Sequence, residues 1–346
     1  MQFYTKQHKF YCGIDLHTKK MYACILDEKG EVREHRNMKA DPDTFLKVIA
    51  PFREDIVVAA ECMFTWYWLA DLCQKEGIPF VLGHALYMKA IHGGKAKNDK
   101  IDSKKIAVLL RGGMIPMSYV YPEKMRATRD LMRRRNHLMR KRAELLAHIQ
   151  NTNSQYNLEE SFGCIAVPSK RGNIVGSFDH PAVQKSMEVN LKVIATYDVL
   201  LDDLERTILK LANHHDPVSY ALLQSVYGIG RIGALTILYE IENIKRFPRV
   251  QDFVSYARLV KCEKTSAGKS YGTSGAKIGN AHLKWAFSEA AVLFLRNNEP
   301  AKRYYEKLVR KHGKGKALSI LAHKLGRAVY FMLKNKEAFD QEKFLR

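Results

Sequence analysis

Four acidic residues of this sequence occupy positions where packing does not explain a carboxylate. Asp15 lies inside an apolar segment near the N-terminus, and Glu61 ends a second apolar segment. A carboxylate among apolar side chains is costly unless its charge is compensated. Asp99 and Asp102 stand three residues apart at the start of an expected helix, which places both on one helix face. Carboxylates that converge opposite a polyanion require a hard cation, and Mg²⁺ prefers oxygen ligands together with phosphate.

The four residues fall on or beside elements of an expected α/β unit. We expect strands at 10–17, in two runs joined at Glu28-Lys29-Gly30, at 56–61 and at 78–83, and helices opened by Asp41, at 65–75, and from Asn98 or Asp99 to about Leu110. The resulting order is β-β-β-α-β-α-β-α. In this order the first strand, the fourth strand and the last helix can bring their acidic residues together at one edge of a sheet.

Each acidic residue has a simpler explanation when it is taken alone. Asp99 can be a helix N-cap, Asp102 a favourable charge in a first helical turn, and Glu61 a solvated strand end. The four together are harder to explain in this way. His17 could lie near a metal, although a strand-end histidine with hydrogen-bond partners is the simpler interpretation.

The distribution of charge indicates a polyanionic partner. The chain carries 57 Lys+Arg and 36 Asp+Glu, a net charge of +21. All of the excess lies in residues 95–142, with +11, and 258–346, with +13, whereas the remainder carries −3. Such segregation suits nucleic acid, because each neutralised phosphate releases bound counterions. A basic surface that is merely solvated is the alternative.

No segment suggests secretion or membrane insertion. No apolar run approaches the roughly 20 residues that span a bilayer, and the N-terminus lacks the apolar segment of a signal peptide. The six cysteines are scattered without a CxxC pair, which argues against a zinc site or a disulfide framework. We therefore expect a cytoplasmic protein with reduced thiols, in which oxygen atoms would hold any metal.

Two long helical patterns occupy the middle of the chain. Apolar pairs recur every seven residues within 123–153, and apolar residues are spaced three and four apart within 194–211. These heptad repeats predict a coiled coil, either within the chain or between subunits. Residues 154–185 contain several Gly and Pro and are interpreted as an insertion of unassigned role. From about Pro217 the chain is expected to be mostly helical.

Three further segments could contact nucleic-acid phosphates. Residues 228–233 read GIGRIG, but the segment before them is typical of a helix rather than the buried strand that a dinucleotide-binding fold requires. We interpret them as a turn between helices whose backbone amides approach a phosphate, with a plain helix–helix turn as the alternative. Arginines clustered in 126–142 suit bidentate phosphate binding, although a solvated coiled-coil face is also compatible. Tyrosines among the cations of 296–316 could stack on bases or simply pack a helix.

Several motifs together resemble one known family. They are GIDLH with Asp15, VVAAEC with Glu61, KNDKIDSKKIA with Asp99 and Asp102, SVYGIGRIGALTILYEIENIKRFPRVQDFVSYARL at 225–259, and TSAGKSYGTSGAKIGNAHLKWAFSEAA at 265–291. In this order they resemble the insertion-sequence transposases of the group numbered one-ten, which includes the eleven-eleven subgroup, and the related pilin-gene DNA invertase. The first three motifs resemble the DEDD tetrad of that family's RuvC-like domain. The last two resemble the helix-hairpin-helix start and the serine-bearing motif of its C-terminal domain.

This resemblance implies a DNA transposase or site-specific recombinase. The tetrad would hold Mg²⁺, and a serine of the C-terminal domain would attack the phosphodiester and form a covalent phosphoserine link to DNA. We assign Ser266 as the nucleophile, with Ser270 and Ser274 as alternatives; a serine hydroxyl is weak and needs a nearby metal or base. The implied partners are DNA at the element ends and the target, a noncoding guide RNA called a bridge RNA, and further copies of the chain in a dimer or tetramer. The implied setting is the nucleoid of a bacterial or archaeal cell.

We expect three domains. An RNase H-like (RuvC-like) α/β catalytic domain spans 1–120, coiled-coil helices with the insertion span 121–216, and a mostly helical transposase domain spans 217–346. The residues assigned to nucleic-acid binding are Lys95, Lys97, Arg126, Arg129, Arg133, Arg134, Arg135, Gly228, Gly230, Arg231, Lys269, Lys277 and Asn280. Two other functions are compatible with the residues. One is a RuvC-like junction-resolving or hydrolytic nuclease without serine catalysis, and the other is a non-catalytic nucleic-acid-binding protein.

Overall fold

The computed structural model describes residues 2–91, 98–158, 165–212, 216–274 and 278–346. They form two compact units, Met1–Lys124 and Met125–Arg346. This division falls close to the expected end of the catalytic domain at 120. The further boundary expected at 216 stays a prediction.

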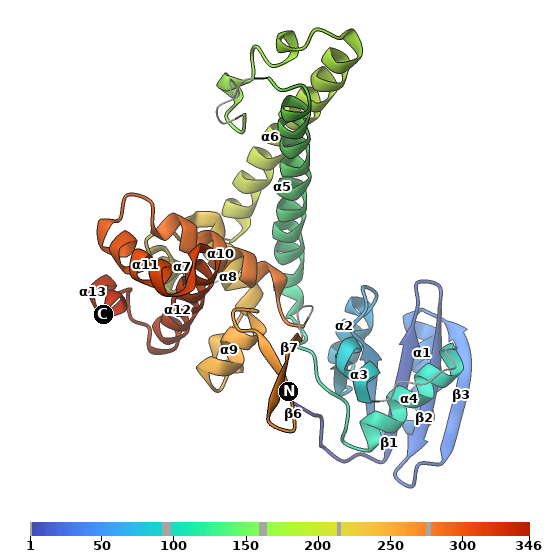
Figure 1. Ribbon diagram of the computed structural model, residues 1–346. Coiled ribbons are helices and arrows are strands. Elements are labelled where there is room, and N and C mark those ends of the chain that lie inside the picture. Colours follow the sequence, from blue (N-terminus) through green and yellow to red (C-terminus); the bar gives the residue numbers. More distant parts are fainter. Residues whose placement is uncertain (1, 92–97, 159–164, 213–215, 275–277) are drawn as a thin grey trace. The chain divides into compact units, whose positions relative to one another are not determined.

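The first unit is built on a five-stranded mixed sheet (Figure 1). Its elements are β1 (Phe10–Leu16), β2 (Lys20–Asp27), β3 (Val32–Lys39), α1 (Pro42–Ile49), a 3-10 turn (Ala50–Phe52), β4 (Ile56–Glu61), α2 (Tyr67–Lys75), β5 (Phe80–Gly83), α3 (Ala85–Ile91) and α4 (Asp99–Arg111). The strand order across the sheet is β3-β2-β1-β4-β5. β1, β2 and β3 pair antiparallel, whereas β1, β4 and β5 pair parallel. The order of elements predicted from the sequence is confirmed, with α3 as an addition that was not predicted.

Local sequence signals set the ends of these elements. Gly30 has a φ of +87° in the turn between β2 and β3, a backbone conformation that glycine adopts without strain. Asp41 accepts a hydrogen bond from the backbone N–H of Thr44 at 3.0 Å and so caps α1. Asn98 accepts one from Ile101 N–H at 2.8 Å, which identifies Asn98 rather than Asp99 as the cap of α4.

The two faces of the sheet are covered by different helices. α1 and α2 cover the face that carries Ile14 of β1 and Ala60 of β4. α4 covers the opposite face, where Ile106 and its neighbours pack against Ala59 and other residues of β4. Since side chains alternate along a strand, Asp15 and Glu61 belong to the face that α4 covers.

α4 lies unusually close to β1 because β1 has a glycine at the contact. A methyl group on Gly13 would stand 2.3 Å from the backbone nitrogen of Ala107 and 2.4 Å from the carbonyl oxygen of Ser103. No other residue type fits at this position without displacing the helix. The first turn of α4 is thereby held over the end of β1.

The second unit is mainly helical, in agreement with the sequence. Its elements are α5 (Glu123–Gln155), 3-10 turns at Pro168–Lys170 and Val175–Ser177, α6 (Pro181–Ala212), α7 (Pro217–Gln224), α8 (Arg231–Ile241), a 3-10 turn (Ile244–Arg246), α9 (Val250–Tyr256), β6 (Cys262–Ser266), β7 (Lys269–Ser274), α10 (Ala281–Phe294), α11 (Glu299–His312), α12 (Lys314–Asn335) and α13 (Gln341–Leu345). Helices α7 to α13 and the ends of α5 and α6 share one apolar core. The antiparallel hairpin of β6 and β7 was not predicted, because its sequence is polar and lacks the alternation of a half-buried strand.

α5 and α6 run antiparallel and side by side (Figure 1). The predicted seam of α6 is buried at Ile194, Leu201 and Ile208, which are seven residues apart. At the far end of the pair, Ile174 and Phe178 of the unassigned insertion complete a small apolar cluster with the two helices. The insertion therefore caps the helical pair. Whether heptad faces also join separate copies of the chain stays a prediction.

Candidate active site

Two of the four predicted carboxylates meet at a histidine. The Nε2 atom of His17 lies 3.5 Å from Asp15 Oδ2 and 3.5 Å from Asp99 Oδ1. One ligand atom from each of the three residues lies within 4.8 Å of the others. The side chain of Asp15 is 17% exposed, and those of His17 and Asp99 are 54% and 57% exposed, so the cluster opens to solvent. Such a separation allows one cation to contact all three side chains.

Strand register brings Glu61 to the same edge of the sheet. In the parallel pair of β1 and β4, Ile14 stands opposite Ala60, so the next residues along the two strands are Asp15 and Glu61. Neighbouring strands are about 4.8 Å apart, and residues in register point to the same face. The two carboxylates therefore lie side by side on the face covered by α4.

The first turn of α4 supplies the remaining carboxylates. Asp99 lies one helical turn before Ser103, the residue that contacts β1 at Gly13. Asp102 lies one turn before Ile106, which packs on the β4 side of the same core. Asp102 therefore belongs to the side of α4 that faces β4, and its Oδ1 lies 3.2 Å from Lys105 Nζ. The positive end of the helix dipole favours both carboxylates at this end.

His17 is the member of this cluster for which the sequence suggested a metal-site neighbour only as the second interpretation. The sequence favoured a strand-end histidine, whereas the structure places its imidazole between two carboxylates. A contact of 3.5 Å is long for a hydrogen bond, so the histidine is a neighbour of both groups rather than a tight partner of either. Its spacing of two residues from Asp15 was the available signal.

Ser266 lies beside the turn of the β6–β7 hairpin. It stands opposite Lys269, and the two residues between them, Ala267 and Gly268, have φ values of +49° and +74°. Two consecutive positive φ values are typical of the tight turns that close two-residue hairpins. Ser266, Lys269 and Ser270 are exposed. The hydroxyl of Ser266 is thus presented to solvent on a defined turn.

Comparisons with known proteins identify the family. The model of the DEDD transposases of the IS110 type matches residues 12–157, and the model described as "Transposase IS116/IS110/IS902 family" matches residues 220–306. The chain is 21% identical over 334 residues to the transposase of insertion sequence element IS1111A of Coxiella burnetii, covering 94% of this chain and 90% of that protein. It is 24% identical over 295 residues to y4qE of Sinorhizobium fredii, a protein described as a transposase, covering 81% of this chain and 70% of that protein.

The chain belongs to the IS110 group of insertion-sequence transposases. The first matched range contains all four acidic residues, and the second contains Ser266. The transposase is accordingly a DNA-processing enzyme. Among its described helices, none combines the length and apolar character needed to cross a bilayer.

The arginines assigned to nucleic acid are largely engaged inside the transposase. Arg126, Arg129 and Arg135 are buried, and Arg135 donates to Glu205 of α6 at 2.8 Å. Of the five assigned arginines of α5, only Arg134 is exposed. A cluster of arginines on one helix thus serves in large part to hold helices together.

Glu240 of α8 is the acceptor at the centre of this network. Its carboxylate is 3% exposed and receives hydrogen bonds from Arg129 at 3.1 Å and from Arg133 at 2.7 and 2.9 Å. Asn280, the buried N-cap of α10, donates to it at 2.7 Å. One carboxylate therefore joins α5, α8 and α10, and Asn280 is occupied within the fold.

The glycine segment forms the predicted turn between two helices, α7 and α8. Gly228 has a φ of +91°, and a methyl group there would stand 2.6 Å from the backbone nitrogen of Phe294 in α10. Gly228 therefore serves packing. Gly230 and Arg231 are exposed at the start of α8, where no side chain caps the helix. Lys95, Lys97 and Lys277 lie outside the described residues.

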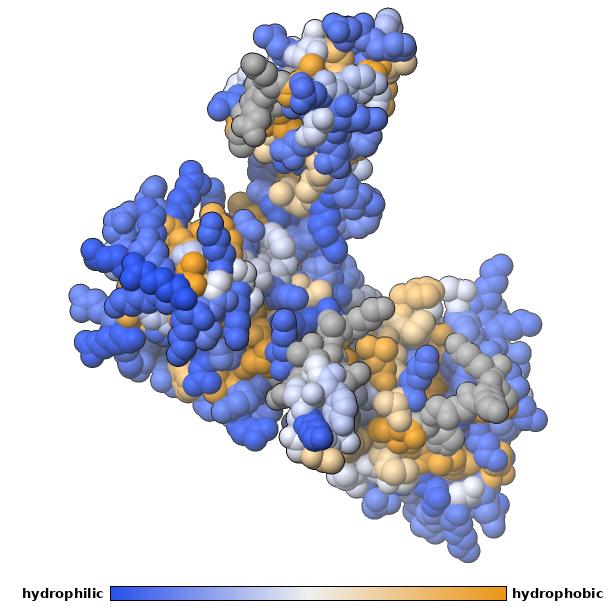
Figure 2. Space-filling model, in the orientation of Figure 1, coloured by the Kyte–Doolittle hydropathy of each residue, from blue (hydrophilic) through white to orange (hydrophobic). Residues whose placement is uncertain are grey.

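Other exposed cations lie on α11. Figure 2 shows strongly hydrophilic side chains gathered over this helix, where Arg303, Lys307, Arg310 and Lys311 are exposed. This helix lies within residues 296–316, where the sequence places tyrosines among cations. Of these, Tyr304 lies under the ammonium group of Lys324, which is 4.4 Å from its ring centre. The tyrosine therefore packs within the transposase.

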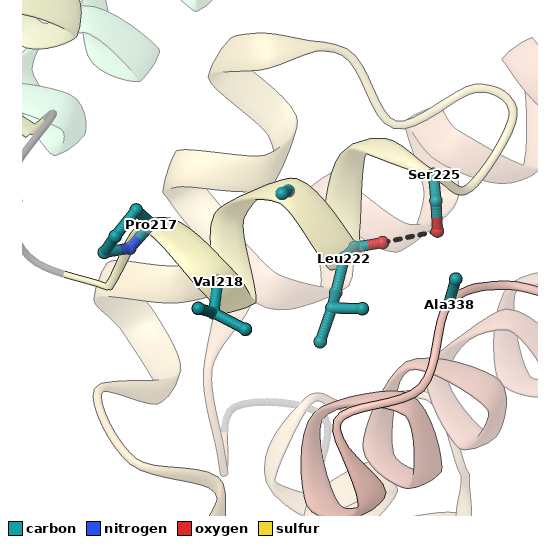
Figure 3. Close-up of a pocket in the computed structure, with 6 residues that line it drawn as sticks. Pro217, Val218, Leu222, Ser225 and Ala338 are labelled. Atoms are coloured by element: carbon teal, nitrogen blue, oxygen red, sulfur yellow. Dashed lines mark hydrogen bonds between the residues drawn. The ribbon is translucent and has the colours of Figure 1, made fainter.

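A shallow pocket on α7 has a mostly apolar lining, unlike the carboxylate cluster. In Figure 3, Val218 and Leu222 project from the same side of α7, and they line the pocket together with Ala338. The hydroxyl of Ser225 donates to the carbonyl of Leu222 at 2.7 Å and accepts from the N–H of Phe339 at 3.0 Å. The lining offers no carboxylate, histidine or cysteine, so we assign it no chemistry.

The Glu240 network predicts a strongly destabilising substitution. Replacing Glu240 by Gln leaves Arg129 and Arg133 buried or half-buried without their common counter-charge. Breaking a buried ion pair in this way costs about 3–5 kcal/mol. We expect the free energy of unfolding of the second unit to fall by that amount, measured by urea denaturation at neutral pH. The exposed Glu306 offers a matched control, since Glu306→Gln should leave stability within about 0.5 kcal/mol.

The pH dependence of stability tests the same prediction in a second way. Burial alone would raise the pKa of the Glu240 carboxyl, but the hydrogen bond from Arg133 and the charges of Arg129 and Arg133 outweigh burial and lower the pKa to about 2. The stabilisation that the ionised Glu240 carboxylate gives to the fold is therefore complete above the ordinary pKa of 4.5 and is lost as the pH falls toward 2. The difference in stability between the wild type and Glu240→Gln should shrink over this interval. A difference that stays constant would contradict the assignment.

Proposed function

We propose that the transposase cleaves and rejoins DNA at a divalent-metal site formed by Asp15, Glu61, Asp99 and Asp102. The observation that carries this proposal is the meeting of Asp15 and Asp99 within one 4.8 Å cluster, with Glu61 next to Asp15 in strand register. The order β3-β2-β1-β4-β5, with a helix over the carboxylate face, supports an RNase H-like fold for this unit.

The donor set fits Mg²⁺. The cluster offers carboxylate oxygens, and it opens to solvent, which leaves room for water and phosphate ligands. Bound at these oxygens, Mg²⁺ would neutralise charge that develops on the phosphate and polarise the phosphoryl oxygen. Carboxylates of the cluster would hold that ion, and the nearby N-terminus of α4 adds a favourable partial positive charge for an anionic phosphate.

We assign Ser266 as the nucleophile. Its Oγ would form a bond to phosphorus while the bond from phosphorus to one deoxyribose oxygen breaks. The serine proton would pass to that leaving oxygen, which ends as a hydroxyl group. The product is a phosphoserine link to DNA, which a second hydroxyl reverses by the same steps. The exposed position of Ser266 beside a tight turn supports this role, since a nucleophile must reach the backbone of DNA.

The partners follow from the family and from charge. DNA is the substrate of a transposase, and we propose that a noncoding bridge RNA selects the site, as the resemblance implies. Exposed cations at Arg134, Arg231, Lys269 and on α11 support contacts with the phosphates of either nucleic acid. Joining two DNA sites requires at least two catalytic centres, and we propose a dimer or tetramer.

The first experiment tests the metal site without DNA. We expect Mg²⁺ or Mn²⁺ to stabilise the first unit by about 2.7 kcal/mol when the ion is a hundred times above its Kd, because the ion binds the folded state. The measurement is thermal denaturation during a metal titration. Asp15→Asn and Asp99→Asn should abolish the shift. Asp43→Asn removes an exposed carboxylate on α1 instead and should preserve it.

A metal-independent melting temperature in the wild type would contradict this site and favour a non-catalytic nucleic-acid-binding protein. An equal shift in all three variants would also contradict it, because the ion would then bind elsewhere.

The second experiment tests the serine. On DNA that carries the ends of the element, the wild type should form a protein–DNA adduct that survives denaturation, and Ser266→Ala should form none. Ser270→Ala changes a neighbouring hydroxyl on the same hairpin and should retain the adduct. The adduct is measured on a denaturing gel and located by mass spectrometry. Strand cleavage by Ser266→Ala at the wild-type rate would support the hydrolytic nuclease instead.

A further inference from the structure

The loop between β4 and α2 presents an aromatic ring to solvent. The side chain of Phe64 is 78% exposed, the largest fraction among the large apolar side chains of the described residues, and Met63 beside it is 50% exposed. Single exposed apolar residues are common on protein surfaces and need no explanation by themselves. Phe64 differs from such residues because hydrogen bonds fix its loop and because this loop borders the carboxylate cluster.

Hydrogen bonds hold the backbone of this loop on both sides of Phe64. On the N-terminal side, Cys62 N–H donates to the carbonyl of Gly83, and Met63 N–H donates to that of Glu61, both at 2.8 Å. On the C-terminal side, the hydroxyl of Thr65 donates to the carbonyl of Leu16 at 3.1 Å. The ring is therefore exposed on an ordered loop and not on a loose one.

The next aromatic residue along the chain is buried. Trp66 is 6% exposed and packs with Ala70 and Leu82. The chain thus buries one aromatic side chain and exposes another two residues earlier. Because an apolar core lies so close by, the exposure of Phe64 results from the direction in which the loop presents it.

The loop borders the carboxylate cluster. Glu61 stands three residues before Phe64, and Thr65 is hydrogen-bonded to Leu16, the residue after Asp15. A DNA phosphate held at the carboxylates carries its own nucleoside, and successive nucleotides of a strand follow at about 3.4 Å. A base that is not paired next to that phosphate would come within reach of the loop.

We propose that Phe64 stacks on an unpaired nucleobase adjacent to the scissile phosphate and so positions the DNA strand at the carboxylates. Every base has a π-face, so an aromatic ring binds it without sequence preference. Apolar side chains also act as wedges that separate stacked bases. Another protein surface is the alternative partner for an exposed apolar ring. The adjoining carboxylates favour nucleic acid instead, because it brings phosphate and a cation. This inference rests on the proposed function of the same site.

The test is a binding experiment that needs no cleavage. The probe is a DNA duplex with a short unpaired stretch that contains 2-aminopurine, a base analogue whose fluorescence is quenched by stacking. The full chain is titrated into it in the presence of Ca²⁺. We expect quenching with the wild type, and with Phe64→Ala no quenching and an affinity about 5- to 150-fold lower, the range for loss of one stacked base. Phe64→Trp should restore both signals.

Two controls separate stacking from other effects. Val32→Ala removes an exposed apolar side chain at the start of β3, at the opposite end of the same sheet, and should bind like the wild type. A fully paired duplex should show a smaller loss with Phe64→Ala than the probe with an unpaired stretch.

Three outcomes would overturn the proposal. The first is that Phe64→Ala quenches and binds like the wild type. The second is an equal loss of affinity on the paired and unpaired probes. The third is a change of oligomeric state by Phe64→Ala without DNA, measured by light scattering, which would assign the ring to a contact between copies. Failure of the metal site appears separately as a missing metal shift of the protein alone.

Discussion

The arrangement of the first unit depends on the parallel pairing of β1 with β4 under a closely packed helix. The register places Asp15 beside Glu61 at the edge where both strands end. Gly13 then lets α4 approach β1 to backbone contact distance, which fixes the first turn of that helix over the same edge. Asp99 at the start of that helix thereby comes within one cluster with Asp15 at the end of β1.

The second unit depends on a buried carboxylate in a comparable way. Glu240 receives hydrogen bonds from α5 and from the cap of α10, and so joins the long helical pair to the C-terminal core. Charged side chains therefore have different surroundings in the two units. In the first unit the carboxylates of Asp15 and Asp99 lie close together at an edge that opens to solvent, with His17 between them. In the second unit opposite charges neutralise one another in the interior.

Much of the first unit could be predicted from its sequence. Alternating apolar segments, the cap Asp41, a cap at Asn98 or Asp99, and the turn glycine Gly30 predicted the elements in their correct order. The helix α3 was missed because a seven-residue helix leaves little periodicity to detect. The β6–β7 hairpin was missed because its strands are polar in sequence. The heptads predicted α5 and α6, whose seam is buried within one chain.

The candidate site shows what such prediction cannot supply. The four acidic residues could be grouped because topology brings strand ends and a helix start together. The arginines of α5 could not be sorted, because the carboxylate that engages Arg129 and Arg133 lies more than a hundred residues away in the sequence. For His17 the sequence left two interpretations open, and the structure places it between two carboxylates. The exposure of Phe64 on a loop held by hydrogen bonds is visible only in the structure.

The central claim is that Asp15, Glu61, Asp99 and Asp102 share a divalent cation. Anomalous diffraction from crystals of the transposase soaked in Mn²⁺ tests it most directly. The account predicts an anomalous peak at about 2.0–2.3 Å from carboxylate oxygens of Asp15 and Asp99, at the edge of the sheet that carries Glu61. A fully soaked crystal with no peak at this edge, or with its peaks elsewhere on the surface, would contradict it.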